Sequence, residues 1–128
     1  MHPQLPHRAD HVGSLLRPEA LRQARLQYKN NSLDLVSLRE IENNAIKSLV
    51  QAQIQTGLKA ITDGEARRDY WHLDFLCGLH GISLKASEGM AFKGVSEIPP
   101  TAVVEDKIQY QPHPMLAHYR FLHAQVPL

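Results

Sequence analysis

The sequence predicts an α/β fold, and two adjacent segments carry that prediction. Apolar residues recur at helical spacing from Leu38 to Thr56, and Gly57 supplies the left-handed position that commonly ends a helix. Residues 58–62 (LKAIT) follow at once and are expected to form a short buried strand that ends in the turn at 63–65. A helix that passes through a glycine into a strand is one step of an alternating α/β chain.

The helix of residues 38–56 is expected to begin at a capping box formed by Ser37 and Glu40. Its core face is expected to pack onto the strand of residues 58–62. This face comprises Leu38, Ile41, Ala45, Leu49 and Ala52, widened by Ile46, Val50 and Ile54. Pro18 suits the first turn of an earlier helix over residues 19–26.

The second half of the chain changes character. Residues 70–77 are compatible with a helix that stops at Gly78. Glycine and proline residues punctuate the segment 82–111, which is expected to form a β-hairpin-like excursion. Pro114 then opens a last helical run to Gln125.

Composition excludes several classes of protein. Fourteen Lys and Arg residues balance thirteen Asp and Glu residues, and no basic run exceeds Arg67-Arg68, so nucleic-acid binding is not expected. The sequence has neither a stretch apolar enough to span a membrane nor the pattern of a signal peptide, which predicts a cytoplasmic protein. The single cysteine, Cys77, cannot form an internal disulfide.

Two short motifs are candidates for chemistry. Thr62-Asp63-Gly64-Glu65 places two carboxylates at the expected carboxyl end of a strand, where α/β proteins bind ligands, although Asp-Gly is equally typical of a simple turn. Residues 10–14 (DHVGS) could bind a carboxylate through Ser14 and neighbouring amides, but a Gly-Ser pair after a strand is more often only a turn.

A metal site within this chain is not expected. His72, Cys77 and His80 are close in sequence, but a spacing of five on a helix does not align His72 with Cys77. The later histidines, spaced by fives at 113, 118 and 123, are expected on the surface. Trp71 and Phe75 are expected to line a core or a cavity rather than to form a stacking platform.

Four segments together resemble a known family. They are residues 8–18 (RADHVGSLLRP), 53–58 (QIQTGL), 61–68 (ITDGEARR) and 71–75 (WHLDF). In order and spacing they resemble short, single-domain proteins related to the C-terminal half of cobalamin-independent methionine synthase. The agreement covers residues 8–82 and is looser to the end of the chain.

The resemblance implies a (β/α)8 TIM barrel that transfers a methyl group from methyltetrahydrofolate to the thiol of homocysteine, with zinc activating the sulfur. It implies that Val12, Gly13 and Ser14 line the amino-acid part of the homocysteine site. It also implies that Glu65 binds the substrate's ammonium group. The zinc ligands of the family lie on later strands and are absent from this chain.

A complete barrel needs about 250 residues, so the 128 residues are expected to be the N-terminal part of one, a single partial domain over 1–128. Such a chain is expected to be inactive alone because the zinc ligands are missing, and its expected macromolecular partner is a complementary C-terminal fragment or a second copy of itself. Two alternatives stay open. One is alkyl transfer to another thiol such as coenzyme M, or the porphyrin decarboxylation of related barrels. The other is a non-catalytic truncated fragment that self-associates through open strand edges.

Overall fold

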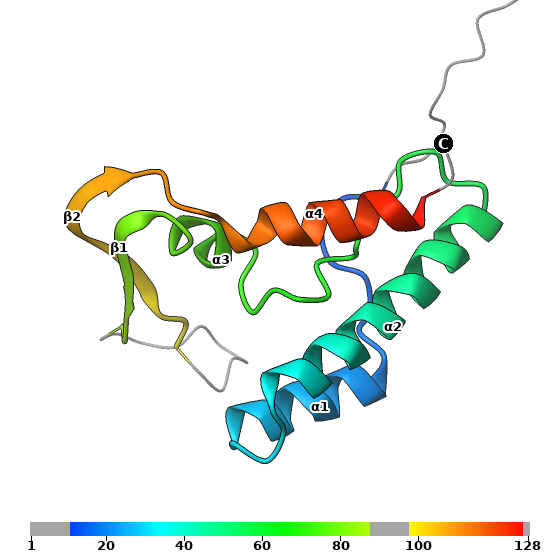
Figure 1. Cartoon of the computed structure of the whole chain (residues 1–128), viewed down its shortest axis with the longest axis horizontal. Coiled ribbons are helices and arrows are strands. Elements are labelled where there is room, and N and C mark those ends of the chain that lie inside the picture. The colour runs from blue at the N-terminus through cyan, green and yellow to red at the C-terminus, as the bar shows by residue number, and fades with distance from the viewer. Residues whose placement is uncertain (1–10, 88–97, 127–128) are drawn as a thin grey trace, which may run out of the picture. The chain divides into compact units, whose positions relative to one another are not determined.

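The computed structural model describes residues 11–87 and 98–126, and the chain divides into two compact units. Residues 68–119 form one unit, and the residues before and after them form the other. The first unit contains helices α1 (Glu19–Lys29) and α2 (Leu35–Gln55), and the second contains α3 (Leu73–Leu76) and strands β1 (His80–Lys85) and β2 (Thr101–Gln109). Helix α4 (Pro114–Gln125) begins in the second unit and ends in the first (Figure 1).

Helix α2 begins three residues earlier than the sequence predicts, because Asp34 caps it. The Asp34 carboxylate accepts hydrogen bonds from the Ser37 backbone N–H at 2.9 Å and from the Ser37 hydroxyl at 2.8 Å. These bonds to Ser37, the backbone one first, hold the pKa of Asp34 below its usual value. The predicted capping box of Ser37 and Glu40 is therefore wrong, since Ser37 is the donor to a cap and not the cap itself.

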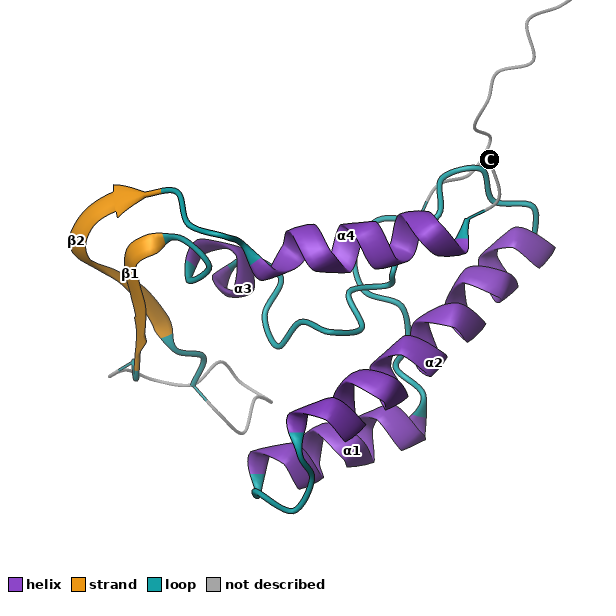
Figure 2. Ribbon diagram, in the orientation of Figure 1, coloured by secondary structure: helices purple, strands orange, loops and turns teal. Residues whose placement is uncertain are grey.

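The core of the first unit lies between α1 and α2, which run side by side in Figures 1 and 2. Its fully buried members are Leu21, Ile46, Val50 and Ala66. The buried face of α2 comprises Leu38, Glu42, Ile46, Val50 and Gln53. The predicted face is therefore displaced: Ile41, Ala45 and Leu49 pack only at the edge of the core, and Ala52 is exposed. The reason is that residues four apart on α2 form the row that contacts the other helix.

The strand expected over residues 58–62 is not formed. The side chain of Gln53 occupies the place of a partner strand: its Nε2 donates to the Thr62 carbonyl at 2.8 Å, and its Oε1 accepts from the Thr62 N–H at 3.0 Å. An extended segment becomes a strand only when a neighbouring backbone supplies a ladder of such bonds. Here the side-chain amide of Gln53 binds both the N–H and the C=O of Thr62, and Ile61 still packs against the core.

In the second unit, β1 and β2 pair antiparallel, with Ile82 opposite Val104 and Lys85 opposite Thr101. This pairing agrees with the hairpin-like excursion expected over residues 82–111, whose glycines at 89 and 94 lie outside the described residues. The register shifts between His80 and Ile82. Gly81 at this shift has φ +84°, and a Cβ there would lie 2.6 Å from the Asp106 carbonyl oxygen, so the bulge requires glycine.

The prediction of part of a (β/α)8 TIM barrel is wrong. Across residues 11–87 and 98–126 the structure contains four helices and one two-stranded antiparallel sheet, without a parallel strand pair. The barrel was implied by the resemblance, and the strand expected after Gly57 as one step of it is an irregular segment whose Thr62 is hydrogen-bonded by the Gln53 side chain. The expectation of a single partial domain over 1–128 stays a prediction. Within the described segments, no helix combines the length and apolarity that crossing a membrane requires.

Ile46 provides a test of the core. We expect Ile46→Ala to lower the free energy of unfolding by about 2–5 kcal/mol, because it empties a fully buried site between two helices. The neighbouring Lys47→Ala changes an exposed side chain and should stay within about 0.5 kcal/mol of the wild type. Chemical denaturation followed by circular dichroism measures both. Equal losses in the two variants would place the core on a different face of α2.

Candidate functional site

The turn at residues 62–65 is built by its own side chains. Asp63 Oδ1 accepts a hydrogen bond from the Glu65 N–H at 2.9 Å, and Thr62 Oγ1 accepts one from the Gly64 N–H at 3.1 Å. These bonds carry the chain into a left-handed conformation, with φ +65° at Gly64 and +56° at Glu65. Asp63 therefore shapes the turn, and Glu65 is the carboxylate presented by it.

The structure brings the two candidate segments together. Leu15 N–H donates to the Gly64 carbonyl at 3.1 Å, and the Ser14 hydroxyl donates to the same oxygen at 3.4 Å. A Cβ at position 64 would lie 2.9 Å from Leu15 side-chain atoms, so this close approach requires glycine. Of the other residues assigned to the site, Val12 is 90% exposed and Gly13 has φ +88°.

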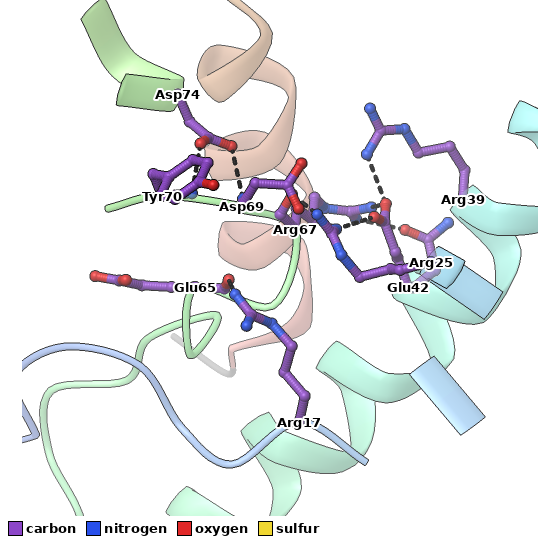
Figure 3. A network of polar contacts seen from close by, with 10 residues as sticks. Arg17, Arg25, Arg39, Glu42, Glu65, Arg67, Asp69, Tyr70 and Asp74 are labelled. Atoms are coloured by element: carbon purple, nitrogen blue, oxygen red, sulfur yellow. Dashed lines mark hydrogen bonds and ion pairs between the residues drawn. The ribbon is translucent and has the colours of Figure 1, made fainter. Parts of the chain in front are cut away.

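Arg17 holds the other side of Glu65. Its Nη2 donates to the Glu65 carbonyl at 3.1 Å, so side chains bind both the N–H and the C=O of this residue. Figure 3 shows the Glu65 side chain extending away from Arg17, whose contact is with the Glu65 backbone. A left-handed backbone costs a residue with a side chain roughly 1–2 kcal/mol, and such strain tends to occur at functional sites. The turn therefore fixes the direction of one carboxylate at an energetic cost.

Beside this turn lies a buried cluster of charges, which we call the Glu42 cluster (Figure 3). Glu42 is 1% exposed and accepts from Arg67 at 2.8 Å, from Arg25 at 3.1 Å and from Arg39 at 2.5 Å. Asn43 Oδ1 accepts a further bond from Arg67 at 2.6 Å. One carboxylate thus joins α1, α2 and the segment that follows the turn.

The Glu42 cluster was not predicted from the sequence. Its signal was present, because Glu42 lies four residues after Leu38 and four before Ile46, on the apolar row of α2. A carboxylate on such a row requires buried cationic partners. Which arginines supply them depends on how α1 and residue 67 pack, and the sequence does not show this.

The residues near Cys77 do not make a metal centre. Burial, and to a smaller extent the Asp74 carboxylate, raise the pKa of the Cys77 thiol, which opposes the deprotonated form that binds metals. Within the described part of the chain, no three His, Cys, Asp or Glu side chains converge as metal ligands. The zinc ligands that the resemblance implies belong to later strands and are not these residues.

The geometry suits recognition of a small cationic or zwitterionic molecule. Glu65 offers a carboxylate on a fixed turn, and the segment of Ser14 lies hydrogen-bonded against that turn. Backbone N–H groups and a hydroxyl near a carboxylate can orient a ligand that has both an ammonium and a carboxylate group.

Comparisons with known proteins agree with the sequence resemblance over most of the chain. No protein-family model matches the sequence. The uncharacterized proteins YxjG and YxjH of Bacillus subtilis strain 168 are 43% and 41% identical to 93% and 92% of the chain. A crystal structure from Listeria monocytogenes, provisionally assigned as a vitamin-B12 independent methionine synthase, is 35% identical over 95% of the chain with a TM-score of 0.78.

The chain spans about a third of each of these proteins: 32% of both Bacillus proteins and 33% of the Listeria chain. The similarity therefore relates 92–95% of this chain to about a third of larger proteins, one of which is provisionally assigned as a methionine synthase.

Strain at Glu65 can be tested by comparing two substitutions. We expect Glu65→Gly to be more stable than Glu65→Ala by up to about 1 kcal/mol, because glycine adopts φ +56° without steric cost. The same pair at the helical residue Glu40 should show the opposite order, with glycine about 1 kcal/mol less stable. Urea denaturation of the four variants gives both differences. The same order at both positions would contradict the strained turn.

Removing the negative charge of Glu42 is expected to lower the free energy of unfolding strongly. Glu42→Gln keeps the size of the side chain but leaves buried guanidinium groups without their carboxylate, so we expect a loss of about 3–5 kcal/mol of unfolding free energy. Glu40→Gln, two residues away and exposed, serves as the control and should change stability by less than about 0.5 kcal/mol. A loss below 1 kcal/mol for Glu42→Gln would mean that water screens the cluster.

Proposed function

We propose that this chain carries the amino-acid-binding part of a site that methylates the thiol of homocysteine, with methyltetrahydrofolate as the methyl donor. The observation that supports the proposal most is the junction of residues 13–17 with the turn at 62–65, which joins the two segments of the resemblance. The similarity to a chain provisionally assigned as a methionine synthase supports the same reaction.

In this proposal Glu65 binds the ammonium group of homocysteine. Its carboxylate extends from a turn whose backbone is held by Asp63 and Arg17, so the backbone of the turn has little freedom left to lose when the ligand binds. The homocysteine carboxylate is bound by the segment of Val12, Gly13 and Ser14 through backbone N–H groups, while the Ser14 hydroxyl donates within the junction. Two-point recognition of this kind orients the chain of the substrate and so directs its sulfur.

The reaction moves a methyl group from a folate nitrogen to sulfur. The S–CH3 bond forms as the N–CH3 bond breaks, the thiol loses its proton and the folate nitrogen gains one. A free thiol has a pKa of about 8.5, so deprotonation of the sulfur has to be assisted at neutral pH. The described residues offer neither a converging set of metal ligands nor a cysteine with a lowered pKa. The role we assign to this chain is therefore to bind and orient the acceptor.

An acceptor without an amino group is the main alternative. Coenzyme M carries a thiol and a sulfonate but no ammonium group, so it makes no use of a carboxylate at position 65. The backbone of Glu65 is strained and is hydrogen-bonded on both sides. Because such strain costs free energy and tends to occur where a side chain has a function, a negative charge at this position favours an amino-acid acceptor.

The acceptor is tested by comparing ligands with and without an ammonium group. Glu65→Gln removes the charge of the carboxylate and keeps its size. Because a charge-assisted hydrogen bond contributes roughly 1.5–3 kcal/mol, we expect homocysteine to bind about tenfold to a hundredfold more weakly. Binding of 4-mercaptobutyrate, which lacks the ammonium group, should be nearly unchanged. NMR titration of both ligands with wild type and variant measures the four affinities.

Asp63→Asn is the matched control, because an asparagine oxygen can still accept the bond from the Glu65 N–H. Its effect on homocysteine binding should be smaller than that of Glu65→Gln. Equal losses for homocysteine and 4-mercaptobutyrate would refute the ammonium role of Glu65. An unchanged affinity for homocysteine would remove this turn from the acceptor site.

A further inference from the structure

His113 joins the start of α4 to α3, and the proposed function makes no use of it. The expectation of a surface position for this histidine is wrong, because it is 9% exposed. Its Nδ1 accepts a hydrogen bond from the Met115 N–H at 3.1 Å, and its Nε2 donates to the Phe75 carbonyl at 2.9 Å. These residues all belong to the unit of residues 68–119, in which the start of α4 lies beside α3 (Figure 1).

The two bonds of His113 require a neutral ring that carries its proton on Nε2. A neutral imidazole has one donor and one acceptor nitrogen, whereas a protonated imidazole has two donors. The Met115 N–H is itself a donor, so it can bind only a bare Nδ1. A proton on Nδ1 would place two donors against each other, and the contact would be lost.

The position of His113 immediately before α4 makes this contact a helix cap. The first N–H groups of a helix have no acceptor within the helix itself. The Leu116 N–H donates to the His113 backbone carbonyl at 3.0 Å, whereas the Met115 N–H depends on the ring. A helix N-terminus also carries a partial positive charge that repels a cation. Protonation of the ring would therefore remove one cap and add an unfavourable charge.

The ring of His113 is closely confined. A Cβ at position 78 would lie 2.1 Å from Nε2, so the ring fits only because this residue is glycine. The Phe75 ring lies on the ring as well, with 5.2 Å between the two centroids. Because the ring fits so closely, the repulsion between two donors is relieved by separating the start of α4 from α3. Phe75 and Met115 line a cavity of about 350 Å³, which this separation would open.

We propose that His113 is a pH-sensitive switch, which holds the start of α4 against α3 while its ring is neutral and releases it when the ring is protonated. Histidine is the side chain that ordinarily gains a proton between about pH 8 and pH 5. The contact is therefore present at the upper end of this range and is lost as the pH falls. The switch lies within the second unit and does not depend on the proposed function.

Other titratable or charged side chains lie on the segments that adjoin His113, namely the residues around α3 and the first turns of α4. They are His72, Asp74, Cys77, His80, His118, Tyr119 and Arg120. Burial, and to a smaller extent Asp74, raise the pKa of the Cys77 thiol, so it stays protonated over this range. Carboxylates, tyrosines and arginines ordinarily keep their charge there as well. The other three histidines are therefore the groups that an experiment has to separate from His113.

Amide hydrogen exchange at Met115 tests the switch. After correction for the intrinsic exchange rate at each pH, we expect the protection of the Met115 amide to fall about fivefold to tenfold from pH 8 to pH 5, as for the loss of one hydrogen bond. The Leu116 amide is the internal control, because its acceptor is a backbone carbonyl, and its protection should be nearly unchanged. Nitrogen NMR of the ring at pH 8 should show a bare Nδ1 and a protonated Nε2.

Substitutions by asparagine assign the transition to one residue. His113→Asn places an acceptor oxygen before α4 that does not gain a proton over this range, and asparagine is a favoured helix cap. The protection of the Met115 amide should then be the same at pH 5 and pH 8. His72→Asn, His80→Asn and His118→Asn are the matched controls, and each should keep the pH dependence of the wild type.

A pH dependence that persists in His113→Asn, or that one of the control substitutions removes, would overturn the proposal. So would a ring that carries its proton on Nδ1 at pH 8, or equal losses of protection at Met115 and Leu116. The ring and amide measurements on the wild type decide the matter even if His113→Asn does not fold. None of them uses homocysteine, so their failure leaves the acceptor proposal standing, and the reverse also holds.

Discussion

A single buried carboxylate, that of Glu42, sets the geometry of the first unit. It binds guanidinium groups from α1, from α2 and from residue 67, and the Arg67 carbonyl accepts a further bond from Arg25 at 2.9 Å. In a low-dielectric interior these charges attract strongly, and none can be left alone without a large desolvation cost. The backbone just after the candidate turn is therefore fixed to both helices at once.

The turn is held at its other end by the same helix. Gln53 binds both peptide groups of Thr62, about three helical turns from Glu42 on the buried face of α2. Only a short segment therefore connects Thr62, which is bound by Gln53, to Arg67, which is bound by Glu42. That short span accommodates left-handed backbone at Gly64 and Glu65, and Asp63 and Arg17 satisfy the peptide groups that this conformation turns outward.

In the second unit, too, side chains form hydrogen bonds with backbone groups of irregular segments. Several backbone groups outside its two strands are bound by side chains: Asp74 binds the N–H groups of residues 69 and 70, His113 binds the Phe75 carbonyl, and Gln111 binds the Gly78 carbonyl. Each such bond satisfies a group that regular structure would otherwise pair. The result is a shaped loop that leaves Trp71 and Phe75 exposed beside Arg68.

Local patterns determined much of the secondary structure. The spacing of apolar residues, Pro18 and Pro114 located the helices, and the glycine- and proline-rich segment located the antiparallel pair. These features depend on neighbouring residues, so the sequence carries them directly. The strand over 58–62, and with it the barrel, was wrong because a strand depends on a distant partner, and here a side chain from α2 took that place.

The same distinction between local pattern and tertiary contact applies to the candidate site. The sequence alone predicted Ser14 and Glu65 as candidate binding residues, and it predicted a turn at Asp63-Gly64. Only the tertiary structure decided that Ser14 touches that turn, that Glu65 is held left-handed by Arg17, and that Glu42 faces three arginines. Apart from the local Arg39–Glu42 pair, those contacts join residues 17 to 50 positions apart, and their strength comes from burial, which no local pattern specifies.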